Sequence, residues 1–385
     1  MAASLAARTL ARPSFESAFG ARAFVRAMLD FEAALAQAQA AEGLIPDAHA
    51  RAIVEACGAV AIDEEALVEE ARRNATLAVP LVRMLREHVA RSSKAAAKDV
   101  HRGATSQDVL DTATALCLRP CLEEADRALD AAVRALARRA REHRATPMLA
   151  RTLLQPAMAI PAGLKIARWA AALAADRERL AEAQAGALAL QLGGPVGALE
   201  GMDGKGPAVR HRMALALGLA DVPEWQSHRN GWIDLLDRVG LVVATCGKIA
   251  RDLALLAQAE VGEMREAPPR EGVGGSSAMP HKRNPVACAR ALAAAVRMPG
   301  LLATVHAAAM GEHERALGGW QAELAVVPEI AAALGAALDF LDTIAASLVV
   351  DPARMRENLA RLDEAAPVDP RAVDEVLAAL APHLA

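Results

Sequence analysis

The stretch LDRVGLVVATCGKIARDLALLA, residues Leu236–Ala257, decides the fold class. Apolar or small residues recur along it at alternating steps of three and four: Leu236, Val239, Val243, Cys246, Ala250, Leu253 and Ala257. Such a heptad seam is typical of a helix that packs nearly parallel to its neighbours. No proline interrupts the surrounding run from Glu224 to Ala267, so we expect one long helix here.

Two more long helices are predicted upstream of this stretch. One begins at Pro120, since proline suits the first position of a helix, and another follows Pro161 and ends near residues 193–195. At 1.5 Å per residue, helices of ~25–40 residues are ~40–60 Å long and need long partners. A helix bundle that other subunits extend would provide them. The helical pattern resumes after Pro285, with expected breaks at Pro299, Gly311–Gly319 and Pro328.

The chain shows no alternating strand pattern, and we predict an all-α fold around a long central helix bundle. Shorter amphipathic stretches at Ala21–Glu42, Asp47–Gly58 and Asp63–Arg73 indicate a helical N-terminal region. We expect an N-terminal helical domain at 1–101, the central bundle at 102–347 and a C-terminal helical segment at 348–385.

Composition excludes several classes of function. The net charge is −4 and aromatic residues make up 2%, which argues against a nucleic-acid partner. No uncharged apolar run reaches the ~18–20 residues of a membrane span, so we expect no membrane partner. The five cysteines are scattered in apolar helical contexts, which predicts free thiols, no metal and a cytoplasmic protein.

Three polar segments with glycine or proline interrupt the helical pattern: HRGATSQD at 101–108, ARTLLQPA at 150–157 and GVGGSSAMPHKRNP at 272–285. The first also has an ordinary structural interpretation, because Thr105 or Ser106 with Asp108 can simply cap a helix. In the second, Arg151 and Thr152 can likewise begin a helix.

The third segment, residues 272–285, is harder to explain as a linker. Its glycines give a flexible start, as in loops that act as lids. Lys282 and Asn284 supply cationic and amide hydrogen bonds suited to carboxylates. Ser276 is a candidate acid–base group if cations and backbone amides make its proton labile. We call this segment the signature loop.

A charged patch follows at residues 311–323, GEHERALGGWQAE, and contains His313 and Arg315. A solvated turn between two helices explains it equally well, so the residues alone leave both interpretations open.

The motif GSSAMPHKRNP at 275–285 resembles the signature loop of the fumarase/aspartase superfamily, which includes adenylosuccinate and argininosuccinate lyases. HRGATSQD and ARTLLQPA resemble the other two conserved regions of that family. The resemblance implies a bundle of long helices, a homotetramer and active sites that each combine residues of three subunits.

Within the superfamily, the segments at 28–46, 188–199 and 311–323 resemble a cycloisomerase branch. That branch closes 3-carboxy-cis,cis-muconate to 4-carboxymuconolactone in protocatechuate degradation. The lyases carry a histidine that assists the leaving group, and this chain has Leu153 there. An amine must be protonated to leave, whereas a carboxylate, with a conjugate-acid pKa of ~4, needs no general acid. Leu153 therefore favours lactone chemistry over C–N cleavage.

The resemblance also implies roles for the candidate site residues. The catalytic candidates are Ser276, Lys282 and Arg315: Ser276 would give a proton to carbon, while Lys282, Asn284 and Arg315 would stabilise the negative charge. The substrate, a small tricarboxylate, needs no metal or organic cofactor. The expected substrate-binding residues are His101, Thr105, Ser106, Gln155, Ser277, Met279 and Asn284.

Two alternatives stay open. One is an adenylosuccinate-lyase-type C–N lyase that releases fumarate, and the other is a non-catalytic scaffold like the lens crystallins of this superfamily. The tail after Leu362 is shorter than is usual in the family, and resembles a shortened C-terminal domain. We therefore expect the active site to be covered less completely.

Overall fold

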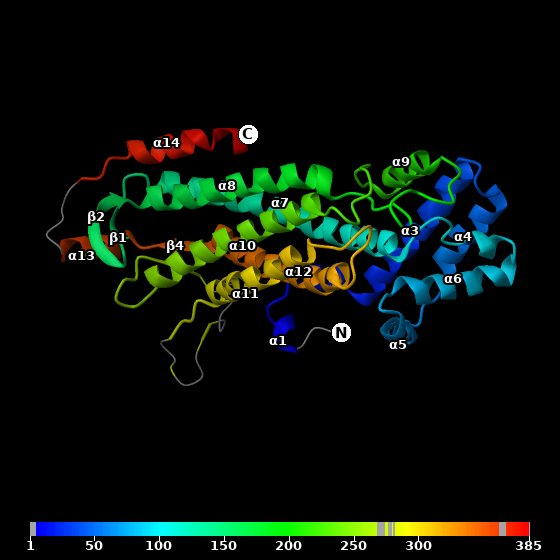
Figure 1. Ribbon diagram of the computed structural model, residues 1–385. Coiled ribbons are helices and arrows are strands. Elements are labelled where there is room, and N and C mark those ends of the chain that lie inside the picture. Colours follow the sequence, from blue (N-terminus) through cyan, green and yellow to red (C-terminus); the bar gives the residue numbers. More distant parts are fainter. Residues whose placement is uncertain (1–4, 268–273, 276–278, 280–281, 362–366, 385) are drawn as a thin grey trace.

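Five long helices form the body of the protein in the computed structural model, which describes residues 5–267, 274, 275, 279, 282–361 and 367–384. They lie side by side along one axis (Figure 1), and each contacts at least two of the others. An all-α bundle is thus confirmed. The five are α7 (Ser106–Glu142), α8 (Ala162–Ala187), α10 (Asn230–Leu256), α11 (Val286–Ala308) and α12 (Gly319–Ser347).

The heptad seam lies on α10 and faces the bundle as predicted. Its first six positions are buried, and Ala257 caps the helix with partial exposure. Gly247 lies on the same helix against α11, where an added Cβ would come within 2.4 Å of the Ala295 side chain. The small residue therefore lets the two helix backbones approach closely.

The prediction that prolines begin or break helices was wrong at three places. Pro120, Pro299 and Pro328 all lie inside helices, on α7, α11 and α12. A proline in a helix interior costs about 3 kcal/mol. Around Pro120 the fully buried Leu118 and Leu122 offset this cost, since each contributes about 1.5–3 kcal/mol by burial. Tertiary packing therefore keeps α7 continuous over 37 residues.

The prediction of helix throughout was wrong at two small antiparallel sheets. β1 (Pro147–Thr152) and β2 (Gln155–Pro161) form a hairpin, so Arg151 and Thr152 end a strand and do not begin a helix. Its turn is made of Leu153 and Leu154, with φ of 52° and 64°. Hairpin turns with two positive φ values usually carry Asn-Gly, so the sequence Leu-Leu gives no indication of this turn. The second sheet pairs β3 (Met264–Glu266) with β4 (Leu348–Val350).

Shorter helices gather at one end of the bundle, where α3 packs on α7 (Figure 1). The predicted N-terminal helices are confirmed as α3, α4 and α5. Of the two predicted domain boundaries, residue 101 lies in the turn before α7 and residue 347 is the last residue of α12. The division into domains stays a prediction. The shorter helices at this end are α3 (Ala21–Ala41), α4 (Asp47–Ala59), α5 (Glu64–Asn74), α6 (Ala78–Ser92), η1 (Ala96–Asp99) and α9 (Gly206–Leu217). α1 (Leu5–Arg8) and α2 (Pro13–Ala18) lie alongside the bundle instead, where α2 contacts α7 and α12.

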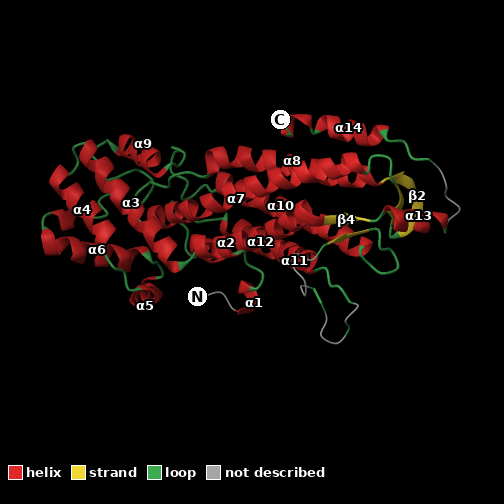
Figure 2. Cartoon of the chain, turned by 180° about the vertical axis from the view of Figure 1, so that it is seen from behind, coloured by secondary structure: helices red, strands yellow, loops and turns green. Residues whose placement is uncertain are grey.

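The C-terminal segment returns along the bundle. α13 (Pro352–Ala360) contacts β1, and α14 (Arg371–Ala379), followed by η2 (Ala381–His383), lies along α8, as Figure 2 shows from behind. This segment therefore packs near the strand hairpin and away from the N-terminal helices.

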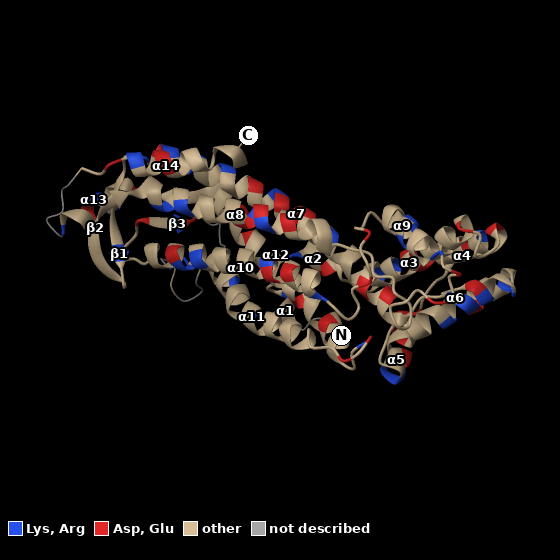
Figure 3. Cartoon of the chain, turned by 45° about the horizontal axis from the view of Figure 1, so that its top comes forward, with Lys and Arg blue, Asp and Glu red and all other residues tan. Residues whose placement is uncertain are grey.

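Charge and hydropathy are unevenly spread over the bundle. Lys and Arg alternate with Asp and Glu along most helices, whereas α11 is largely free of charge in Figure 3. By length and composition alone, α11 and α12 are apolar enough to cross a membrane. α12 is a core helix with 67% of its most apolar window buried, but only 22% of that window is buried on α11. The apolar face of α11 is therefore largely exposed on the surface of the bundle.

Candidate active site

The first polar segment forms a rigid corner at the start of α7. Thr105 and Asp108 make a capping box, so the helix-cap interpretation of this segment is confirmed. The buried Asp108 carboxylate accepts four hydrogen bonds: from the backbone N–H groups of Thr105, Gly193 and Gly194 at 3.0, 2.9 and 3.0 Å, and from the Gln191 side chain at 3.0 Å. Burial raises the pKa of Asp108 to about 6, although these donors oppose the rise. The corner is therefore fixed to the loop that follows α8.

Capping α7 is not the only role of this segment, because Arg315 from the turn after α11 also contacts it. Arg315 donates a hydrogen bond from Nη1 to the Thr105 hydroxyl, although 210 residues separate the two. Ser106 begins α7 next to this contact and is partly exposed. The charged patch at 311–323 is thus more than a solvated turn, and the structure brings Thr105, Ser106 and Arg315 together.

His101 lies just before this corner with a left-handed φ of 62°. Its Nδ1 is 2.7 Å from Oε1 of the fully buried Glu32 on α3. Burial lowers the pKa of His101, but the Glu32 carboxylate raises it by more, so the net shift is upward. The ion pair uses Nδ1 and leaves Nε2 for a ligand. A protonated imidazole here suits a substrate carboxylate.

Two buried groups that the sequence analysis missed hold the Arg315 turn. Gln226, which is 2% exposed, donates from its side-chain amide to the backbone carbonyl of Glu314 at 2.9 Å. Arg229 bridges α7 and α12, through Asp111 at 2.7 and 3.0 Å and Glu323 at 2.7–3.1 Å. Both come from the unremarkable segment WQSHRN at 225–230, where only clustered polar residues hinted at a role.

The second polar segment lies at the far end of α7. Gln155 begins β2 and is exposed, and Leu153 at the hairpin turn is 96% exposed. Arg151 fixes the hairpin by a two-fold ion pair to the buried Glu263, at 2.8 and 3.0 Å. Since α7 has 37 residues and rises 1.5 Å at each, roughly 55 Å separates Gln155 from the corner with Thr105. One chain cannot bring these residues to one substrate.

The signature loop lies before α11, and Ser276 and Ser277 are outside the described residues. The exposed side chains of Met279, Lys282 and Asn284 belong to the described part. The Asn284 N–H donates to the Gly274 carbonyl oxygen at 2.7 Å, so the chain at Gly274 and the chain at Asn284 lie next to each other. Gly274 has φ of 75°, and a Cβ there would lie 2.6 Å from the Asn284 carbonyl oxygen. Only glycine fits at position 274, where the chain passes this close to Asn284.

A carboxylate anchors the end of the loop. Both oxygens of Glu266 accept from the first turn of α11, at Ala287 N (3.0 Å) and Cys288 N (2.9 Å). The loop is thereby held at the start of α11, and the Arg315 turn follows the other end of that 23-residue helix. At 1.5 Å per residue this is a separation of roughly 35 Å. The three groups of candidate residues therefore lie in three separate places on one chain.

Comparison with known proteins identifies the class of this fold and site. The lyase family profile matches residues 7–300, and the chain belongs to this family, the fumarase/aspartase superfamily. The prediction of the family is thus confirmed.

Within this family, the chain is similar to several cycloisomerases. The chain is 46% identical over 357 residues to a 3-carboxy-cis,cis-muconate cycloisomerase of Bradyrhizobium diazoefficiens, covering 92% of this chain and 79% of the relative. It is 41% identical over 349 residues to the same-named protein of Pseudomonas putida, covering 90% and 82%. The crystal structure of the 3-carboxy-cis,cis-muconate lactonizing enzyme from Pseudomonas putida matches with a TM-score of 0.87 and 37% identity, over 99% of this chain and 88% of that one.

Proposed function

We propose that this protein is an enzyme that converts 3-carboxy-cis,cis-muconate to 4-carboxymuconolactone. The observation that carries the proposal is the 46% identity, over 92% of the chain, to a relative named for that reaction. The residues at the corner of α7 agree with it, because His101 and Arg315 present cationic groups beside two hydroxyls. A small tricarboxylate requires such a concentration of positive charge and donors.

The reaction is an isomerisation within one molecule. A carboxylate oxygen of the substrate adds to a conjugated double bond, and a C–O bond forms as the C=C π bond breaks. Negative charge then builds on the carboxylate conjugated with the carbon to be protonated, where Lys282, Asn284 and Arg315 stabilise it. Ser276 gives its proton to that carbon, and a proton from solvent restores its hydroxyl. Nucleophile and electrophile both belong to the substrate, so the balance requires no cofactor.

Leu153 supports lactonisation over the adenylosuccinate type of C–N cleavage. It stands fully exposed on the hairpin turn beside Gln155, with a side chain that has no proton to give. Departure of an amine would need a general acid at this place, whereas a carboxylate is a stable leaving group in the reverse reaction. A non-catalytic scaffold would have no need to gather the His101 and Arg315 cations and two hydroxyls at the corner of α7.

The active site is shared between subunits in our proposal, and the protein is a cytoplasmic homotetramer. The separations of roughly 35 and 55 Å along α11 and α7 support this, because only another copy can complete the site. The apolar face of α11 supplies a surface for that copy, with Val296 72% exposed and Val286 37% exposed. A second copy fits this face better than a membrane, because Arg290 and Arg297 on α11 pair with Asp339 and Glu329 on α12.

Loss of the muconate absorbance in a spectrophotometric assay tests the activity directly. Ser276→Ala is expected to lower turnover by orders of magnitude with an unchanged circular-dichroism spectrum, and Arg315→Ala to lower kcat/KM. Near-normal turnover of Ser276→Ala would remove that assignment. Fumarate released from adenylosuccinate, with no loss of muconate, would favour the C–N lyase.

Mixing the two impaired variants, Ser276→Ala and Arg315→Ala, tests whether the site is shared. If Ser276 and Arg315 of one site come from different chains, subunits exchanged at equal ratio give about one quarter of the sites both intact residues. Activity should then return to about a quarter of the wild-type value. If both residues act within one chain, no intact site forms and activity stays absent.

A further inference from the structure

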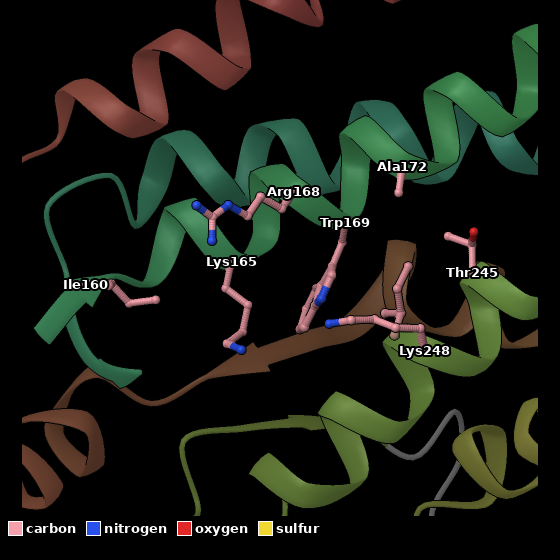
Figure 4. Close-up of a pocket in the computed structure, with 8 residues that line it drawn as sticks. Ile160, Lys165, Arg168, Trp169, Ala172, Thr245 and Lys248 are labelled. Atoms are coloured by element: carbon pink, nitrogen blue, oxygen red, sulfur yellow. The ribbon is translucent and has the colours of Figure 1, made fainter. Parts of the chain in front are cut away.

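A cavity of about 390 Å³ opens between α8 and α10, and none of the candidate site residues lines it. Figure 4 shows its walls, with Lys165 and Trp169 extending from α8 toward Lys248 of α10 and Arg168 beside them. The residues that line it are Ile160, Lys165, Arg168, Trp169, Ala172, Thr245, Lys248 and Ile249.

The walls combine positive charge with an apolar floor. Three of the eight lining residues are cations and none is a carboxylate. The Trp169 indole is held in place, because its Nε1–H donates to Asp252 Oδ2 at 3.1 Å. Lys248 contacts the same oxygen and is thereby partly neutralised. Thr245 donates to Asp176 Oδ2 at 2.5 Å, so its own proton points away from a ligand.

The two α8 cations that line the cavity form no ion pair within the described part of the chain. Neither Lys165 nor Arg168 has an ion pair or a side-chain hydrogen bond there, although most arginines of this protein are paired. Burial lowers the pKa of Lys165, and the nearby Lys248 and Arg151 lower it further, against Asp252 and Glu263. Lys165 and Lys248 extend into the cavity from its two sides, whereas the exposed Arg168 lies at its edge (Figure 4). The two lysine charges repel each other, and an anion between them would relieve the repulsion.

We propose that this cavity binds a small organic anion with two or three carboxylates. The carboxylates would pair with Lys165, Arg168 and Lys248, and the carbon body would lie on the ring of Trp169. An inorganic anion would satisfy the charges but leave the apolar floor uncovered. The cavity volume lies within the ~300–1,000 Å³ of small-molecule pockets.

The test measures binding of citrate, a tricarboxylate probe, by calorimetry on the full-length chain. The chain carries Lys282→Ala and Arg315→Ala, which remove charged groups of the candidate active site and so isolate the cavity. We expect citrate to bind one site per chain, and sulfate to bind at least about tenfold more weakly. Lys165→Met and Lys248→Met, made singly in that background, should each weaken citrate binding about tenfold, which corresponds to ~1.4 kcal/mol.

Two controls make the result specific to the cavity. Lys94→Met removes the same charge from an exposed position on the N-terminal side and should leave citrate binding unchanged. Citrate should alter tryptophan fluorescence in the parent chain, and Trp169→Phe should abolish that change. Citrate affinity that is equal in Lys165→Met, Lys248→Met and the parent would overturn the proposal. Absence of binding would also overturn it, as would occur if a second copy filled the cavity.

The experiment does not depend on turnover. Citrate binding to the Lys282→Ala/Arg315→Ala chain, with no consumption of the muconate by the wild-type chain, would leave this inference intact and refute only the proposed reaction. Consumption of the muconate by the wild-type chain, with no citrate binding to the double variant, would do the reverse.

Discussion

Replacing Arg229 by methionine should destabilise the protein strongly, because this side chain pairs with two buried carboxylates, those of Asp111 and Glu323. Arg229, Asp111 and Glu323 have side-chain exposures of only 4%, 4% and 3%. Arg229 also stacks on Trp225, with its guanidinium carbon 4.7 Å from the ring centroid. Removal of one partner from a buried ion pair costs about 3–5 kcal/mol, since the remaining charge is left uncompensated.

That cost is a large part of the ~5–15 kcal/mol by which a typical protein is stable. Burial raises the pKa of Glu323 while Arg229 lowers it, and the net shift is already upward. In Arg229→Met the opposing cation is gone, so the buried Glu323 carboxylate should take up a proton more easily. The deficit in stability should therefore shrink as pH falls.

Urea denaturation followed by circular dichroism, at one fixed protein concentration, measures this deficit. The matched control is the triple variant Arg229→Met/Asp111→Asn/Glu323→Gln, in which all three charges of this network are removed. It should recover most of the lost free energy of unfolding, because neutral groups of similar volume replace the charges. A single variant that loses less than about 1 kcal/mol, or a triple variant no more stable than the single one, would refute the argument.

Three further predictions concern the site and its assembly. Gln226→Met removes the hydrogen bond that Gln226 donates to the Glu314 carbonyl, a loss of about 0.5–1.5 kcal/mol that frees Arg315; kcat/KM should fall about 2–10-fold with normal secondary structure, and an unchanged kcat/KM would exclude the positioning role. The pKa of His101 is raised above its ordinary 6.5, so its pair with Glu32 stabilises fully below that pH and is lost as pH rises through the raised value. The stability difference between wild type and His101→Gln, measured by denaturation, should thus shrink toward alkaline pH, and a difference that grows would contradict it. Val296→Asp should reduce the mass by light scattering while the circular-dichroism spectrum is kept, whereas an unchanged mass would show that this face of α11 is not an interface.

The sequence was informative where local chemistry decides the structure. The seam of α10 follows from apolar spacing alone, and the capping box of Thr105 and Asp108 follows from side chains that bond the adjacent backbone. The hairpin turn was missed because Leu153 and Leu154 adopt positive φ in place of the usual Asn-Gly. The prediction of a helix start at Pro120 was wrong because the packing of the whole bundle keeps α7 continuous there. No local sequence pattern indicates that packing.

The candidate site was predictable in its residue types but not in its placement. Motif residues identified Thr105 and Arg315, yet nothing in the sequence says that these two meet while Gln155 lies a helix length away. Arg229 and Gln226 escaped because their partners are up to 118 residues distant. Such buried contacts exist only once the chain has folded.

The two sides of the candidate site differ in how firmly one chain fixes them. The corner with Thr105 and Arg315 is held by contacts within a single chain, through the Asp108 cap, the Gln226 bond to Glu314 and the Arg229 network. The side chains of Lys282 and Asn284 and the Gln155 strand are exposed, and lie at the ends of long helices. A charge-stabilising site works best when its donors are fixed before the substrate arrives. We infer that each chain folds with its Arg315 corner already in working geometry, and that assembly brings the loop and hairpin of other copies to this corner.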